Sequence, residues 1–394
     1  MNDNWVFSHV IIGDAATGVS YFRRNSINIT FWREVKKGNH ILFVAPRRVG
    51  KTSIMKDLVE NCPEGYVGIY DDTESIRSRE EFFQRLFELL IHSLDQSRLE
   101  KARTFLDRCI KKYAIKEITR TGIRIESREI DYEREVHDLL PAMKDAQVHS
   151  VIFLDEFAEI LFKLKQNGKH QDAIEILYTL RAMRSNENFK NFTVVYAGSI
   201  GLETVVKSID RPKLINDLHP IKVPPLTQDE ARHLIEQVTE GATIHFSDEM
   251  IAYVCKKLEY LLPYYLCLMV AAIENIAYDK NEPEVDRTVI DEAFEKIIDE
   301  RKNFEDWLER LKKYHSKHFA FINELLKQAA HEGSITVEAI YNKAKEYGRM
   351  EDYMDFVDML CYDGYLTAME RRVYRFSSPL LRGFWLEKYP INYA

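Results

Sequence analysis

The stretch that decides the fold is ILFVAPRRVGKTS, residues 41–53. Ile41 to Val44 form an apolar run of the kind found in a strand buried on both faces. Ala45 to Thr52 match the phosphate-loop pattern GxxxxGK[ST], with alanine in place of the first glycine. A helix is expected from Thr52 to about Asn61. Because the loop stands between a buried strand and a helix, the context favours a phosphate site over a basic turn that matches by chance.

The residue types in this loop suit nucleotide phosphates. Successive backbone N–H groups curl around phosphates, and the helix N-terminus adds a partial positive charge. Gly50 lets the backbone approach closely, Lys51 reaches the β- and γ-phosphates, and Thr52 ligates magnesium. Alanine is tolerable at the first glycine, because that position lies farthest from the transferred phosphate. The residues expected to bind ATP are Ala45, Pro46, Arg47, Arg48, Val49, Gly50, Lys51, Thr52 and Ser53.

A second segment, SVIFLDE at Ser150 to Glu156, is an apolar strand that ends in two acids. In open parallel sheets, ligands bind at the carboxyl ends of strands. Asp155 would hold magnesium directly or through water, and Glu156 would act as general base toward the attacking water. If Glu156 were only a solvated charge at the strand end, the protein would bind ATP but hydrolyse it poorly.

A third strand is expected at Phe192 to Ala197, followed by Gly198 and Ser199. The Ser199 hydroxyl could bond the γ-phosphate or the attacking water. The alternative is that Gly198-Ser199 is only a turn, and the sequence leaves both open.

The rest of the N-terminal part alternates strands and helices. We expect a helix at Ile29 to Lys37, a strand at Tyr66 to Tyr70, a strongly helical stretch from Glu80 to about Tyr113, and a hairpin from Ile115 to Ile130. After the strand at Ser150 to Leu154, a helical stretch should reach Arg184. This alternation predicts an α/β fold, with a mainly parallel sheet and helices on both faces.

The character of the chain changes after Pro224-Pro225. From Thr227 to about Glu309 nearly everything reads as helix, and Thr227 to Glu230 form a capping box. From about Ser316, three helices (Lys317 to Ala330, Thr336 to Tyr347 and Asp352 to Asp363) precede two hairpin strands (Tyr365 to Ala368 and Val373 to Ser377), which is a winged-helix order. We therefore expect a P-loop core at residues 1–223, a helical lid at 224–315 and a winged-helix domain at 316–394.

The composition of the 394 residues sets the protein class. A hydrophobic fraction of 45% and a charged fraction of 30% are those of a globular protein. The net charge of −8 gives no global attraction to nucleic acid or to an anionic membrane. The five cysteines are dispersed and form no CxxC pair, so neither a disulfide framework nor a zinc site is expected. We see neither a membrane span nor a signal peptide in the sequence, and we expect a cytoplasmic protein.

These segments resemble the AAA+ superfamily, within its STAND-like branch, and most of all the archaeal-type ATPases that also occur in bacteria. The residues that carry the resemblance are APRRVGKTS (45–53), VIFLDEF (151–157), AGSIGLE (197–203), LLPYYL (261–266) and YRFSSPLLRGFW (374–385). The resemblance covers nearly the whole chain. It implies an ATPase core, a helical lid and a C-terminal winged helix.

The resemblance also implies roles for residues outside the loop. The lid's proline motif lies near adenine in that family, which places Pro263 and Tyr264 there. AAA+ proteins often complete the site with an arginine from a neighbouring subunit. Arg211 is the candidate by position, and Arg181 and Arg184 are rivals that would act in cis. Since an arginine finger contributes about 10³ to 10⁵ in rate, turnover without one should be slow.

The charges of the winged helix argue against its usual association with DNA. The segment Glu351 to Asp363 contains five acids and no lysine or arginine. DNA affinity comes mostly from lysine and arginine contacts to phosphates, so an acidic helix would be repelled. Only the wing is basic, with Arg371, Arg372 and Arg375. We expect the domain to face a protein or to lock the lid, with Phe356, Val357 and Leu360 in its core.

Three functions remain open from the sequence. The first is an ATP-binding protein and slow magnesium-dependent ATPase that acts as a nucleotide-dependent switch on a partner protein. The second is a DNA-binding or DNA-remodelling ATPase resembling the origin-recognition branch of AAA+. The third is a nucleotide-binding scaffold that hardly hydrolyses. Homo-oligomerisation is compatible with all three.

Overall fold

The computed structural model describes residues 4–97, 99–119, 122–125, 130–198, 201–209, 211–370 and 372–390. The chain forms two compact units. The sheet unit comprises Arg23–Val44 and Lys51–Val223, and the helical unit comprises Met1–Phe22, Ala45–Gly50 and Pro224–Ala394. The chain therefore passes from the sheet unit to the helical unit after Val223, beside the double proline. The six residues of the phosphate loop, Ala45–Gly50, also belong to the helical unit.

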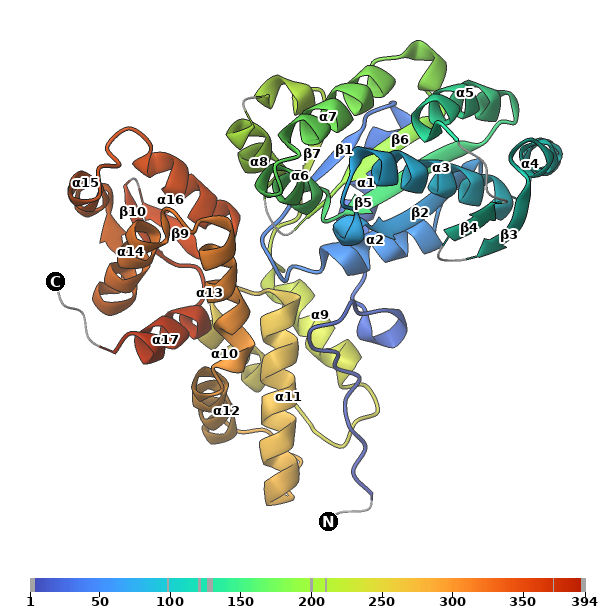
Figure 1. The fold of residues 1–394 in the computed structure, drawn as a ribbon. Coiled ribbons are helices and arrows are strands. Elements are labelled where there is room, and N and C mark those ends of the chain that lie inside the picture. Colours follow the sequence, from blue (N-terminus) through green and yellow to red (C-terminus); the bar gives the residue numbers. More distant parts are fainter. Residues whose placement is uncertain are drawn as a thin grey trace. The chain divides into compact units, whose positions relative to one another are not determined.

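A five-stranded sheet in the order β2-β5-β6-β1-β7 forms the centre of the sheet unit (Figure 1). Its strands are β1 (Ile41–Val44), β2 (Tyr66–Asp72), β5 (His149–Asp155), β6 (Phe192–Tyr196) and β7 (His219–Lys222). All the pairings are parallel, as predicted. β6 is buried along its whole length and β5 at all but its first residue, which explains why both segments read as continuous apolar runs.

Helices connect and cover these strands. They are α1 (Asn25–Lys36), α2 (Lys51–Glu60), α3 (Arg79–Gln96), α4 (Glu100–Tyr113), α5 (Tyr132–Asp145), α6 (Phe157–Gln166), α7 (His170–Arg184) and α8 (Leu202–Ser208). Helices α2 and α3 pack against β2. The side chain of Ser78 accepts from the Glu81 amide and caps α3, so this helix begins where a capping residue precedes the apolar periodicity.

The stretch from Glu80 to about Tyr113 is strongly helical, as predicted. The structure has two helices, α3 and α4, and the backbone is extended at Ser97 and Leu99 between them. The Ser97 hydroxyl accepts from the Leu99 amide at 3.3 Å. Such local side-chain bonds compete with helical ones, and they explain a break that apolar periodicity alone does not reveal.

The hairpin expected after α4 is present as β3 (Ile115–Thr119) and β4 (Gly122–Ile125), which pair antiparallel. The Thr119 side chain accepts from the Gly122 amide at 3.2 Å and so closes the turn. The part of the prediction that falls on 126–129 lies outside the described residues.

The first part of the helical unit after Pro224 is nearly all helix, as the sequence predicts. It contains α9 (Gln228–Val238), α10 (Asp248–Leu258), α11 (Pro263–Lys280), α12 (Arg287–Asp299) and α13 (Lys302–Tyr314). The capping box at Thr227 and Glu230 is formed in both directions. Residues 4–22 belong to this unit too, and both the amide and the hydroxyl of Ser8 donate to the buried carboxylate of Glu274 on α11.

The C-terminal part contains, in order, the three helices and the two hairpin strands that the sequence predicts for a winged helix. It consists of α14 (Phe319–Glu332), β8 (Ile335–Thr336), α15 (Val337–Glu346), α16 (Tyr353–Tyr362), β9 (Leu366–Glu370), β10 (Val373–Phe376) and α17 (Pro379–Lys388). The three strands form an antiparallel sheet in the order β8-β10-β9. Phe356, Val357 and Leu360 are buried, as expected, whereas Asp355 and Asp358 are exposed. Whether this part and the preceding helices are separate domains stays a prediction.

In the described part of the chain, no helix has the length and apolar character that a membrane crossing requires.

Candidate functional site

Two segments of the sheet unit that the sequence singled out are in contact. Thr52 lies in the first turn of α2, the helix that follows β1 and the loop, and Asp155 is the last residue of β5. The Thr52 hydroxyl donates to Oδ2 of Asp155 at 2.8 Å. The parallel sheet causes this contact, because it brings the carboxyl ends of its strands to one edge. The two residues predicted to hold magnesium are therefore side by side.

Asp155 is held by further hydroxyl groups. Tyr70, in β2, donates to the same Oδ2 atom at 3.1 Å, and the hydroxyl of Thr73 donates to the Asp155 carbonyl at 2.6 Å. Burial and the neighbouring Glu156 raise the pKa of Asp155, while its hydrogen bonds to Thr52 and Tyr70 oppose that rise. Tyr70 was not predicted as a site residue. Its position could have indicated one, because Tyr70 is the last residue of the predicted strand that pairs with β5.

Glu156 has an unusual backbone conformation. Its φ is 56°, in the left-handed region that non-glycine residues rarely occupy, and it stands immediately before α6. Its amide donates to Oδ1 of Asp155 at 3.0 Å. Strained backbone of this kind concentrates at functional sites and persists where the surroundings enforce it. The structure thus places Glu156 beside Asp155 at the same strand end, as the sequence predicts.

The loop from Ala45 to Gly50 belongs to the helical unit and continues covalently into Lys51 and Thr52. Gly50 has φ 91°, and a Cβ added there would meet no atom within 4 Å. This position favours glycine because of its backbone angle, since the left-handed region costs other residues energy. Arg48 has φ 65°, so it is a second non-glycine residue, after Glu156, with a strained backbone.

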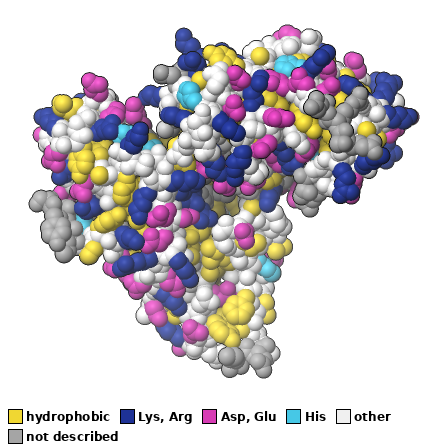
Figure 2. Space-filling view, viewed as in Figure 1, with side chains coloured by type: hydrophobic (Ala, Val, Ile, Leu, Met, Phe, Trp, Pro, Cys, Tyr) yellow, Lys and Arg dark blue, Asp and Glu magenta, His cyan; other side chains and the backbone are white. Residues whose placement is uncertain are grey.

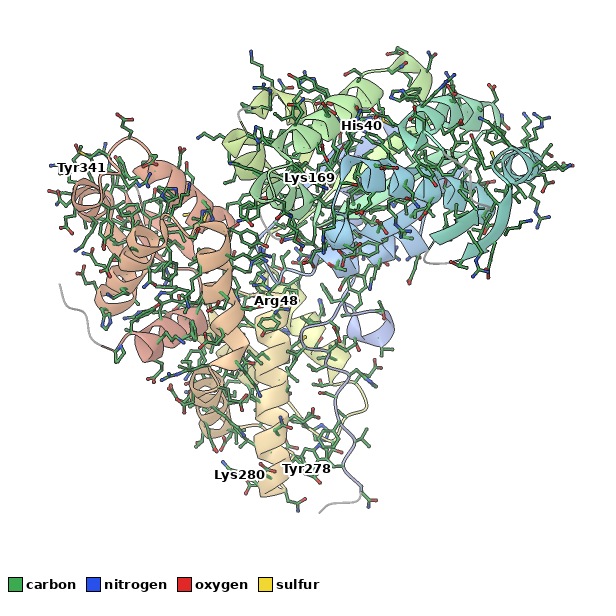
Figure 3. All side chains as sticks on the ribbon, viewed as in Figure 1. His40, Arg48, Lys169, Tyr278, Lys280 and Tyr341 are labelled. Carbon is green, nitrogen blue, oxygen red and sulfur yellow. The ribbon has the colours of Figure 1, made fainter. Side chains whose placement is uncertain are left out.

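The loop contacts the proline motif of the helical unit. Pro263 is the first residue of α11, where its missing N–H costs nothing. The next residue, Tyr264, lies under the Arg48 guanidinium at 4.6 Å from its ring centroid, and Figure 3 shows Arg48 at the start of α11. The structure therefore brings together two segments to which the resemblance assigns nucleotide contacts.

The remaining candidates differ in what the structure shows. Ser199 lies outside the described residues. Arg211 is exposed and precedes a short helical turn, Pro212–Ile215. Arg184 is fully engaged: its side chain is 1% exposed, it forms a two-pronged ion pair with Asp217, and it also donates to Tyr196 and to the Leu214 carbonyl. That bonding makes Arg184 a structural residue, which leaves Arg211 and Arg181 as candidates.

The residues present fit a magnesium nucleotide. Within the described ranges there is no cluster of three or more histidine, cysteine or acidic side chains that could hold a metal unaided. A site built from Thr52, Asp155, phosphate oxygens and water does not need one, because magnesium usually keeps several waters and takes one or two protein ligands. Lys51, in the first helical turn beside Thr52, would supply a positive charge to the phosphates.

Comparisons with known proteins agree with this fold. The chain is similar to the Walker-type ATPase of Pyrococcus abyssi, with a TM-score of 0.62, 15% identity and coverage of 93% of this chain and 96% of that one. It is similar to the ORC2 protein of Aeropyrum pernix, solved as ADPNP–ADP complexes, with a TM-score of 0.51, 12% identity and coverage of 98% and 96%. The family model of the EcoEI R protein C-terminal region matches residues 213–374.

No curated protein matches the sequence. The structural similarity extends over nearly the whole length of both chains, so it concerns the sheet, the helices and the C-terminal part together. At these identities the likeness establishes architecture. The chain therefore shares its fold with the Walker-type ATPase and with the ORC2 protein.

Proposed function

We propose that this protein binds ATP with magnesium and hydrolyses it slowly. The observation that carries the proposal is the hydrogen bond between Thr52, at the end of the phosphate-loop pattern, and Asp155, at the end of β5. A chance match to the loop pattern would not be expected to bring a threonine in the first turn of a helix against a buried acid on a separate strand. The solved ATPases with this fold add support at the level of architecture.

Each residue has a part that follows from its chemistry. Backbone N–H groups of the loop and the Lys51 ammonium hold the phosphates, and Thr52 and Asp155 position magnesium. The metal, when bound, neutralises charge on the phosphate oxygens. Glu156 accepts a proton from the attacking water, for which a carboxylate near the strand end is suited. Ser199 and Arg211 remain proposed contributors, and Pro263 a proposed adenine neighbour.

We further propose that the ATPase is a switch that acts on a partner protein. The winged-helix part supports this, because Asp355 and Asp358 are exposed on α16. Arg375, one of the basic residues of the wing, is already paired with Glu259 at 2.5 Å. On the face drawn in Figure 2, acidic and basic side chains are interspersed. These charges disfavour the DNA-remodelling alternative. Capture of a partner from the native host in the presence of ATP, and its loss with ADP, would test the switch.

The nucleotide site is tested by Lys51→Ala, with affinity for magnesium and ATP measured by titration calorimetry. We expect loss of measurable binding, because the lysine supplies the point charge nearest the terminal phosphates. The matched control is Lys36→Ala: Lys36 is an exposed lysine at the end of α1 in the same unit, and its removal should leave binding unchanged. Unaltered affinity in Lys51→Ala would disprove the assignment.

A further inference from the structure

An acid on α13 holds the two arginines of the phosphate loop. Nη2 of Arg47 lies 2.6 Å from Oδ2 of Asp306, and Nη2 of Arg48 lies 3.0 Å from the same oxygen. The arginine side chains are only 19% and 23% exposed, so these ion pairs are partly shielded from water. All three residues belong to the helical unit. The loop that would bind phosphates thus already has a carboxylate bound to its side chains.

This ion-pair cluster is incompletely bonded. Asp306 Oδ1, Arg47 Nη1 and Arg48 Nε are buried and have no hydrogen-bond partner. Arg310, one turn further along α13, also has a buried Nη2 atom without a partner, and burial together with the charge of Arg310 lowers the pKa of Arg47. A buried polar group that is left unpaired loses the hydrogen bonds it would make with water. Two guanidinium groups therefore share one carboxylate, and buried donors on Arg47, Arg48 and Arg310 remain for a ligand with more oxygens.

The two arginines and Pro46 make further contacts. Arg48 donates to the Gly13 carbonyl at 3.3 Å and lies over Tyr264 at 4.6 Å. Pro46 lies close to Gly364, where an added Cβ would come within 3.1 Å of it. Arg48 also has the strained positive φ noted above. The bonds to Asp306 are accordingly a charged attachment of a loop whose backbone is strained at Arg48.

We propose that Asp306 is an internal competitor for the phosphate groups of the nucleotide. Arg47 and Arg48 exchange its carboxylate for phosphate oxygens when a nucleotide binds, Arg310 provides a third donor, and the loop's contact with α13 is lost. A phosphate group offers more acceptor oxygens and more charge than a carboxylate, and guanidinium groups bind it in a two-pronged manner. This inference rests on the proposed function, because it specifies how the same site is regulated.

The test is Asp306→Asn, which keeps the shape of the side chain and removes its charge. Affinity for magnesium and ADP, measured by calorimetry, needs no turnover. We expect the variant to bind at least about fivefold more tightly, which is the lower end of typical coupling between sites. The matched control is Glu309→Gln: Glu309 is on the same helix but pairs with Lys312, and the change should leave the affinity as in the wild type.

Hydrogen exchange of the unaltered protein gives a second readout that needs no variant. Amides of Lys302–Tyr314 should exchange faster with ADP and magnesium present, since the loop no longer contacts α13. Wild-type ADP binding without that change, or Asp306→Asn binding no more tightly than wild type, would overturn the competition and leave the nucleotide site intact. If the wild type binds no nucleotide, the proposed function itself fails.

Discussion

Asp155 and Glu156 are neighbours in the chain, but their surroundings differ. Asp155 is 4% exposed, and its Oδ2 atom accepts from two hydroxyl groups. Glu156 is partly exposed and occupies a strained backbone conformation before α6. A buried acid with fixed hydrogen bonds is suited to positioning a cation, whereas a more accessible acid can exchange protons with water. The two carboxylates can therefore have different roles in one site, with Asp155 positioning the cation and Glu156 accepting the proton.

This division predicts the effect of Glu156→Gln. The amide keeps the shape of the side chain but cannot accept a proton, so nucleotide binding should persist while hydrolysis slows by about 10² to 10⁴. Single-turnover phosphate release and calorimetry on the same preparation would measure both. If hydrolysis continues at the wild-type rate, a different residue is the base.

His40 predicts how stability depends on pH. Burial lowers the pKa of His40 to about 3, with the charge of Arg184 as a smaller cause. Its Nδ1 atom accepts from the Val194 amide at 3.0 Å, a bond that the neutral ring makes. Because the folded pKa lies below the unfolded value of about 6.5, this contribution to stability is present above pH 6.5 and is lost as pH falls toward 3.

His40→Asn tests this contribution, since asparagine can still accept a bond but does not titrate. Urea unfolding at pH 7.5 and pH 5 should show the wild type losing up to about 2 kcal/mol more than the variant between those values. The His149 pKa, lowered by burial to about 4, gives the variant a residual slope. Equal losses in the two proteins would rule out His40 as a source of acid sensitivity.

At the scale of elements, short apolar runs were the most predictable feature. β1 spans Ile41–Val44, as expected, because a strand buried on both faces leaves a clear apolar signature. β7 was not predicted, because His219–Lys222 is a polar edge strand that contains a proline. Asp306 could not be foreseen either, because nothing local marks one acid on a charged helix as the partner of a loop 259 residues away.

The contact between α2 and β2 depends on a glycine. A Cβ at Gly68 would lie 2.8 Å from Cys62 Sγ and 3.0 Å from the Val59 backbone, both closer than van der Waals contact allows. Gly68→Ala should therefore push α2 away from β2 and lower the free energy of unfolding by about 1–3 kcal/mol, the range for overpacking. In the same unit, Gly122→Ala serves as the control, because its Cβ would meet only Glu88 at 3.5 Å.

Chemical denaturation of both variants measures this effect. Since α2 carries Lys51 and Thr52 in its first turn, nucleotide affinity should fall in Gly68→Ala as well. A Gly68→Ala protein as stable as Gly122→Ala would show that the helix adjusts without cost.

At the scale of the whole molecule, Arg211 raises the question of self-association. If Arg211 completes the site of a neighbouring copy, turnover per chain should rise with protein concentration, and Arg211→Ala should flatten that rise. Lys213→Ala is a matched control, because Lys213 is an exposed cation two residues away. A wild-type rate that is independent of concentration would favour a site complete within one chain, with Arg181 as the candidate.

The charges of the winged-helix part predict weak DNA binding at most. Any binding should come from the wing, disappear in the double variant Arg371→Ala/Arg372→Ala, and fall steeply as salt is raised. Arg371 lies outside the described residues. A salt titration with random-sequence duplex measures this, and tight binding that persists at about 200 mM salt would restore the DNA-remodelling alternative.

Ala45–Gly50 belong to the helical unit, although the residues on both sides of them belong to the sheet unit. This has a consequence for recombination between related genes. Recombination between related genes at the Val223–Pro224 junction would join a loop bearing two arginines to a foreign α13. Unless that helix carried an acid at the place of Asp306, the loop arginines would lose their ion pairs with α13, even if both halves folded correctly. Lineages that exchange these halves should therefore keep, or restore by second mutations, the match between the loop arginines and the acid on α13.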